Sequence, residues 1–344
     1  MKKYGLFLLI AILLCMAPLF GNPSSDRSAS QASWPVRPIT LIIPWNPGDG
    51  TDLAGRAFAQ ALQNVTGQPV VVVNRPGASG SVGTIYASQQ APDGYTLLFS
   101  AETPGTFQIM GLTDVSFSDF EGIMVMAEDT RVLVVSRDSP YRTIQDLLNA
   151  MRANPGRIRL AYSGPGASGH IEGLILDALG YNVSMTPFGG GAAGLTAVMG
   201  GQVDYTGANT ATIMGFVASG DLRPLATFTN RRTDALPGVP AITEVLPESS
   251  QFLPLGFPHA VLVPKNTPPD IRAQILAATE KAIEDRAWLD FLDARVSFRP
   301  LHEHRGPGVN EFWARWQSIV CWLLYDAGVT QRSPADFGIP RIQR

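Results

Sequence analysis

The stretch ITLIIPWNPGDGTDLAGRAFAQAL, residues 39–62, decides the expected fold. Its first five residues are β-branched or leucine and predict a buried strand over residues 39–43. The segment PWNPGDG then ends the strand, and Thr51 or Asp52 offers an N-cap for a helix over residues 53–63. A strand, a glycine-rich turn and a helix in this order are typical of the βαβ unit of a parallel sheet.

The same unit recurs along the chain and restarts near residue 158. Further strands are expected at residues 70–73, 96–99, 132–135, 158–162, 185–188, 203–205, 225–228 and 260–263. Further helices are expected at residues 81–90, 143–151, 170–179, 195–199, 269–285 and 309–325. The repetition predicts two similar α/β lobes. Periodicity alone leaves open whether the C-terminal helices return to the first lobe.

Composition limits the class of protein. The chain has 344 residues, of which 45% are hydrophobic and 16% charged, with a formal net charge of −3. This hydrophobic content excludes a disordered chain, and the nearly neutral charge argues against a nucleic-acid partner. The 34 glycines and 27 prolines predict many loops between short elements. The length suits about two domains.

The N-terminus has the pattern of an export signal. Two lysines precede an apolar run and small residues, which predicts a secretory signal peptide over residues 1–21. Lipidation of Cys15 after cleavage is the alternative. A polar, serine-rich segment over residues 22–33 predicts a disordered linker. If Cys15 leaves with the signal, only Cys321 remains and no intramolecular disulfide can form.

Three glycine-rich turns lie between predicted strands and helices, at residues 47–52, 163–170 and 189–194. The first turn of a helix has N–H groups without intrahelical partners and a partial positive charge, so it attracts anions. Glycine allows close approach to the backbone. Such turns on two lobes predict that backbone amides hold a carboxylate without an arginine. The alternative is that they are only the tight turns that α/β folds need.

Two enzyme motifs are incomplete. Gly164, Gly166 and Gly169 match the dinucleotide fingerprint, but residues 185–189 lack the carboxylate that this fingerprint requires. The segment GASGH that begins at Gly166 lacks the final glycine of a nucleophile elbow. Nicotinamide chemistry and a serine nucleophile are therefore disfavoured.

Metal and acid–base chemistry have weak support as well. His302 and His304 form a possible ligand pair, but they lie in a polar loop between prolines, which favours a solvated loop. Asp204 is either a general base or, as the end of a short strand, a residue that caps a turn or touches a ligand. No metal ion and no cofactor is expected.

Several longer segments resemble one family. They are WPVRPITLIIPWNPGDGTDLAGRAFAQAL (residues 34–62), VVVNRPGASGSVGT (71–84), APDGYTLLFS (91–100), SGPGASGH (163–170), MGGQVD (199–204), GDLRPLATFTNRR (220–232) and LPGVPAITE (236–244). In this order they are similar to substrate-binding proteins of tripartite tricarboxylate transporters, the Bug/TctC type. The resemblance implies a two-lobed, type II periplasmic binding protein fold with a ligand cleft between the lobes. Lobe 1 would comprise residues 34–137 and 262–344, and lobe 2 residues 138–261.

The resemblance also implies a ligand site. Backbone amides of two facing turns would hold the ligand: Gly48, Asp49, Gly50, Thr51 and Asp52 opposite Gly164, Pro165, Gly166, Ala167 and Ser168. The rest of the site would be lined by Trp45, Ser100, Glu102, Gly190 and Asp204. Three departures from the family pattern weaken the expectation of a highly charged ligand. Asp49 replaces a glycine, Ala167 stands where a hydroxyl residue is common, and Gly189 where a lysine or arginine is common.

The expected function is that of a periplasmic solute-binding protein. It would capture a di- or tricarboxylate or a similar organic acid in a closing cleft and deliver it to the large and small membrane subunits of a tripartite tricarboxylate-type transporter. The protein would be a monomer, would not be an enzyme and would bind no nucleic acid. The alternative is an extracytoplasmic sensor or an enzyme that acts on a small organic acid in the same cleft.

Overall fold

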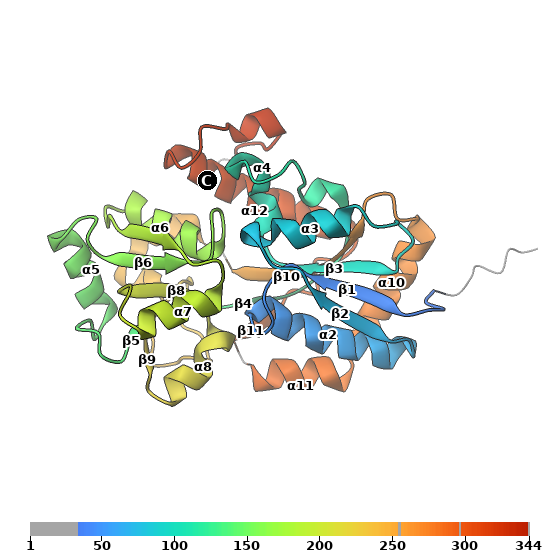
Figure 1. Ribbon diagram of the computed structural model, residues 1–344, viewed down its shortest axis with the longest axis horizontal. Helices are drawn as coiled ribbons and strands as arrows, with labels where there is room; N and C mark the ends of the chain where they lie inside the picture. Colours follow the sequence, from blue (N-terminus) through green and yellow to red (C-terminus); the bar gives the residue numbers. More distant parts are fainter. Residues whose placement is uncertain (1–33, 254–255, 296, 343–344) are drawn as a thin grey trace, which may run out of the picture. The chain divides into compact units, whose positions relative to one another are not determined.

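The computed structural model describes residues 34–253, 256–295 and 297–342. The predicted signal peptide, the linker and Cys15 lie outside these residues. Two mixed β-sheets form the framework, and Figure 1 shows them next to each other. None of the described helices is both long enough and apolar enough to cross a bilayer.

The first sheet has the strand order β11-β4-β10-β3-β1-β2. Its strands are β1 (Ile39–Ile43), β2 (Val70–Asn74), β3 (Thr96–Ser100), β4 (Phe120–Asp129), β10 (Phe257–Pro264) and β11 (Phe298–Pro300). Strands β1, β2 and β3 are parallel, as the βαβ pattern predicts, whereas β10 runs antiparallel between β3 and β4. The C-terminal ends of β1 and β3 therefore lie at the same edge.

The second sheet has the order β7-β6-β8-β5-β9. Its strands are β5 (Arg131–Ser136), β6 (Arg159–Tyr162), β7 (Ser184–Pro187), β8 (Tyr205–Asn209) and β9 (Leu222–Thr227). Strands β6, β7 and β8 are parallel, and β5 is antiparallel to both β8 and β9. This sheet repeats the strand–turn–helix organisation of the first.

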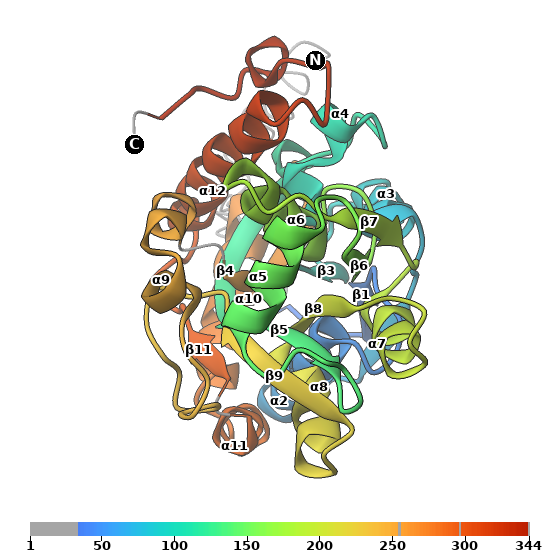
Figure 2. The ribbon, with the colours of Figure 1, turned by 90° about the vertical axis from the view of Figure 1, so that its left-hand side faces the viewer.

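Helices cover both faces of each sheet. The helices are α2 (Gly50–Thr66), α3 (Ser81–Ser88), α4 (Phe107–Met110), α5 (Ile144–Ala153), α6 (Ser168–Ala178), α7 (Gly191–Met199), α8 (Thr210–Ala218), α9 (Ile242–Val245), α10 (Pro269–Ala282), α11 (Arg286–Ala294) and α12 (Pro307–Asp326). On the first sheet, α2, α10 and α11 cover one face, and α3 and α12 the other. On the second, α5 and α6 lie opposite α7 and α8 (Figure 2).

Side-chain alternation explains these layers. In β1, Leu41 packs under α2 while its neighbour Ile42 faces α3, because successive strand residues point to opposite faces. In β5, Leu133 and Val134 divide in the same way between the two faces of the second sheet. We call the first sheet with its helices the first lobe, and the second sheet with α5–α9 the second lobe. The C-terminal helices α10–α12 belong to the first lobe.

The lobe boundaries differ from the predicted ones. Strand β5 pairs with β8 and β9, so residues 131–136 lie in the second sheet and not in the first lobe. The chain crosses between the sheets at Thr130, directly after β4. On the return, all of β10 from Phe257 onwards lies in the first sheet, although residues up to 261 were expected in the second lobe.

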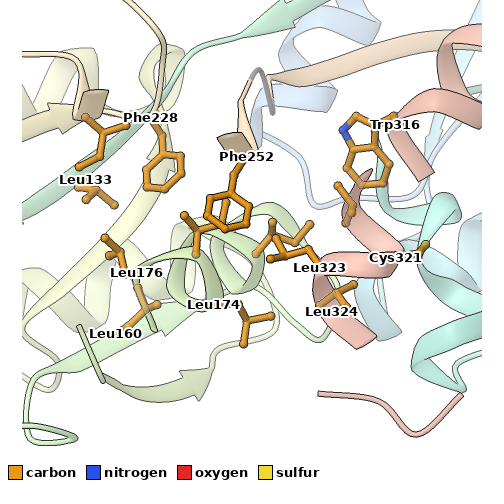
Figure 3. Close-up of a cluster of buried hydrophobic side chains, with 14 of the residues drawn as sticks. Leu133, Leu160, Leu174, Leu176, Phe228, Phe252, Trp316, Cys321, Leu323 and Leu324 are labelled. Carbon is orange, nitrogen blue, oxygen red and sulfur yellow. The ribbon is translucent and has the colours of Figure 1, made fainter. Parts of the chain in front are cut away.

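One hydrophobic cluster connects the lobes along the side of α12. Figure 3 shows Trp316, Leu323 and Leu324 of α12 on one side of Phe252, with Phe228 and Leu176 of the second lobe on the other. All of these side chains are buried. The two lobes therefore share an apolar contact in addition to their covalent connections.

Candidate functional site

A pocket lies where the two lobes meet. It is lined by Trp45, Asp49, Gly50, Thr51, Glu102 and Phe257 from the first lobe, and by Arg131, Ser163, Ala167, Ser168, Gly191, Leu195, Ala208, Asn209 and Thr212 from the second. The space that a water-sized sphere can enter measures about 40 Å³. That is room for roughly three water molecules, so a ligand of several heavy atoms enters only if the lobes move apart.

Four helices begin at this pocket. Gly50 and Thr51 start α2, Ser168 starts α6, Gly191 starts α7, and Thr212 lies in the first turn of α8. Each of these N-termini presents unpaired N–H groups and a partial positive charge. The strand–turn–helix units of both lobes therefore direct their positive ends to one point.

Three of these helix N-termini already interact with side-chain carboxylates of the chain itself. Glu102 accepts a hydrogen bond from the Ser168 N–H of α6 at 3.2 Å. Asp129 accepts one from the Ala211 N–H of α8 at 3.4 Å, and the Ala192 N–H of α7 interacts with the Asp49 carboxylate. The structure thus differs from the expectation of free amides in the second lobe.

Helix α2 is the exception. Its N-cap residue, Asp49, makes no side-chain capping hydrogen bond, which differs from the expected cap by Thr51 or Asp52. No described residue accepts a hydrogen bond from the N–H of Gly50 or Thr51. The Thr51 hydroxyl and the Trp45 indole N–H are buried and likewise have no partner among the described residues. Helix α2 and its surroundings therefore provide the pocket's unused hydrogen-bond donors.

Glu102 links the two lobes. It follows β3 and is fully buried, and its Oε1 accepts hydrogen bonds from both the hydroxyl and the N–H of Ser168. The N-cap of α6 is Ala167, which has no side-chain oxygen, so Glu102 takes the place of a cap. Burial raises the pKa of Glu102, and the Ser168 hydrogen bonds offset only part of that rise.

Arg131 is the cation of the pocket, and the sequence interpretation missed it. Its guanidinium forms a buried ion pair with Glu172 of α6, with Nε at 2.7 Å from Oε1. It also donates to the carbonyl of Gly207 at 2.8 Å and to the side chain of Asn209. One signal was available: Glu172 is a carboxylate with apolar residues on both sides in the middle of the helix sequence SGHIEGLILDA, which indicates a buried cationic partner.

The predicted site residues fall into three groups. Trp45, Asp49, Gly50, Thr51, Glu102, Ala167 and Ser168 line the pocket. Gly164 and Pro165, again with Trp45, line an adjoining hollow of about 220 Å³. Gly48, Asp52, Ser100, Gly166, Gly190 and Asp204 line neither.

Residues of the third group have structural partners. Asp52 accepts hydrogen bonds from Gly48, Arg56 and Asn74; burial alone would raise its pKa, but these bonds more than offset that effect and lower it. Asp204 forms an ion pair with Arg159 at the end of the second sheet opposite the pocket, because β8 begins one residue after it.

Gly166 and its neighbours form a contact between the lobes. The Gly166 N–H donates to His170 Nδ1 at 3.1 Å, and its carbonyl accepts from the Thr106 hydroxyl of the first lobe at 3.2 Å. Gly166 has a φ of 74°, and a Cβ there would meet Thr106 Oγ1 at 2.4 Å. A glycine is therefore required both by the backbone conformation and by the contact.

Asp129 makes stability depend on pH. Burial raises its pKa to about 7, although Arg131 and hydrogen bonds oppose the rise. The folded chain thus holds this proton more tightly than the unfolded chain, and the associated stability is lost as the pH rises from about 4 to 7. We expect Asp129→Asn to gain about 2 kcal/mol over wild type at pH 8 and nothing at pH 4, measured by urea unfolding.

Asp221→Asn is the matched control, because Asp221 lies in a half-exposed ion pair with Arg137. It should bring no gain at pH 8. If Asp129→Asn and wild type were equally stable at both pH values, burial of the ionised Asp129 carboxylate would not destabilise the fold.

The two sheets and the pocket between them define the fold class: a two-lobed fold of the periplasmic binding protein type. The solved structure of the periplasmic binding protein BugD matches with a TM-score of 0.79 at 24% identity, over 87% of this chain and all of that one. A family model described as "Tripartite tricarboxylate transporter family receptor" matches residues 54–303. The chain belongs to this family, which confirms the resemblance seen in the sequence.

Two further proteins illustrate the relationship. The protein BugT of Bordetella pertussis is 28% identical over 307 residues, covering 86% of this chain and 89% of BugT. The structure of MatC from Rhodopseudomonas palustris, described with bound malate, has a TM-score of 0.74 at 23% identity and covers 83% of this chain and all of MatC.

Proposed function

We propose that this protein is a periplasmic solute-binding protein that captures a small carboxylated metabolite between its lobes and delivers it to the membrane subunits of a tripartite tricarboxylate-type transporter. Membership of the receptor family and the two-lobed fold support this function. The observation that carries the proposal is the N-terminus of α2: Gly50 and Thr51 line the pocket, and their N–H groups donate to no residue that the structure describes. MatC, which has the same fold, binds malate, a dicarboxylate.

The ligand carboxylate is placed at α2. The N–H groups of Gly50 and Thr51, the Thr51 hydroxyl and the Trp45 indole can donate to its oxygens. Hydrogen bonds to a charged acceptor each contribute about 1.5–3 kcal/mol, so a few of them suffice for micromolar binding. The second lobe offers this carboxylate fewer hydrogen-bond donors than expected, because the N–H and the hydroxyl of Ser168 already donate to Glu102.

Lobe closure is the proposed mechanism. The pocket is lined by both lobes and is too small in the closed arrangement to admit a metabolite. A ligand that contacts both lobes binds the closed arrangement more tightly than the open one and shifts the population towards it. The transporter subunits would then recognise the closed form.

A thermal-shift screen tests the proposal. Mono-, di- and tricarboxylates and amino acids are added to the purified protein, and at about 100 times its Kd a true ligand stabilises the fold by about 2.7 kcal/mol. Thr51→Val keeps the shape of the side chain and removes its hydroxyl, so we expect about tenfold weaker binding of the best acid.

The control Thr243→Val changes a threonine whose hydroxyl bonds to the Asn230 carbonyl, away from the pocket, and should bind as wild type does. Stabilisation by uncharged sugars alone, with no response to any carboxylate, would refute the proposed function.

A further inference from the structure

The charges of the pocket do not balance. Its lining includes three charged side chains: Asp49, Glu102 and Arg131. Arg131 forms its ion pair with Glu172 and donates to Gly207 and Asn209, although its positive charge also acts on Glu102. Neither of the two pocket carboxylates, Asp49 and Glu102, forms an ion pair with a described residue.

Unused acceptor atoms lie at both carboxylates. Glu102 is 0% exposed, and its Oε2 has no hydrogen-bond partner on any other described residue. Asp49 is 9% exposed, and its Oδ2 has no partner among the described residues either. A buried carboxylate oxygen without a donor or a cation is costly. A donor from outside the chain, above all a positively charged one, would remove this cost.

Unused donors lie in the same pocket, around α2. They are the N–H groups of Gly50 and Thr51, the Thr51 hydroxyl and the Trp45 indole. The pocket therefore presents donors for an anion and acceptors for a cation within one small space. A molecule that carries only carboxylates would satisfy the first set and leave the second set unpaired or opposed by like charge.

Building on the proposed function, we propose that the ligand is a small amino acid whose carboxylate binds at the start of α2 and whose ammonium group binds Glu102 Oε2 and Asp49 Oδ2. An ammonium group has three hydrogen-bond donors and a positive charge, so it can donate to both carboxylate oxygens. Glu102 is the main determinant of the preference for an amino acid, because it is fully buried and its position is fixed by hydrogen bonds from Ser168.

Matched acids test this substrate class. Aspartate and malate share a carbon skeleton and differ only in an amino or a hydroxyl group, and so do alanine and lactate. Calorimetric titration of the full folded protein should show that one amino acid binds at least tenfold more tightly than its hydroxy acid. In Glu102→Gln the preference should fall below threefold, because the neutral amide keeps an oxygen for Ser168 and loses the charge.

The control is Glu128→Gln, a carboxylate in the same lobe that pairs with Arg299 away from the pocket; it should keep the tenfold preference. Malate or lactate binding as tightly as its amino partner in the wild type would overturn this inference and leave the proposed function standing. Binding of none of the acids, amino or hydroxy, would instead overturn the proposed function. The wild-type comparison decides the question even if Glu102→Gln fails to fold.

Discussion

Arg131→Leu is expected to lower the free energy of unfolding by about 3–5 kcal/mol, because it leaves a buried charge without its partner. Glu172 is 4% exposed and forms its ion pair with Arg131, and Asp129 and Glu102 also feel the positive charge of this guanidinium. The neutral leucine fills part of the volume but offers no donor to Gly207 or Asn209. Urea unfolding at pH 7.5 measures the loss.

Two further variants show that the loss arises from burial. Arg159→Leu breaks the ion pair with Asp204 in the same sheet, but Arg159 is 46% exposed, so we expect a loss below about 1 kcal/mol. The double variant Arg131→Leu with Glu172→Leu should recover most of the stability, since no unpaired charge remains. Equal losses in Arg131→Leu and Arg159→Leu would contradict this account.

Gly50→Val is expected to weaken ligand binding at least a hundredfold, which is the second large effect. A Cβ at residue 50 would lie 2.4 Å from Asn209 Nδ2 across the pocket, and the Asn209 side chain is held by Arg131. The branched side chain would also cover the N–H groups at the start of α2. Closed contact between the lobes and access to the amides are therefore both lost.

Isothermal titration with the best acid of the panel measures this effect, and small-angle scattering reports the separation of the lobes. Gly215→Val is the matched control, because Gly215 is an exposed residue of α8 and a Cβ there meets nothing within 4 Å. It should bind as wild type does. Binding by Gly50→Val within threefold of wild type would show that α2 does not hold the ligand.

Local patterns were sufficient for the repeated strand–turn–helix units. β1 and α2 follow from a β-branched run and a glycine turn, and β6 and α6 follow in the same way. Strand β4 was missed because half of its sequence FEGIMVMAED consists of glutamate, glycine, alanine and aspartate, which are depleted in strands. It is formed by tertiary pairing with β10 on one side and β11 on the other.

The composition of the site could be predicted only in part. The turns at residues 47–52 and 163–170 were identified because the anion-binding property of a helix start is local. What occupies those starts is not local: Glu102 reaches Ser168 across 66 residues, and Arg131 reaches Glu172 across 41. For this reason the sequence did not reveal that an arginine lines the pocket.

The apolar cluster along α12 has a consequence for how the molecule opens. Separating the lobes there would expose Phe252, Leu323 and Leu174 to water, at roughly 25 cal/mol for each Å². On the pocket side the lobes meet instead through polar bonds, such as those from Ser168 to Glu102, which water can replace. We therefore expect the lobes to rotate about the hydrophobic contact along α12, which stays buried. The solute would then enter and leave from the polar rim on the side opposite α12.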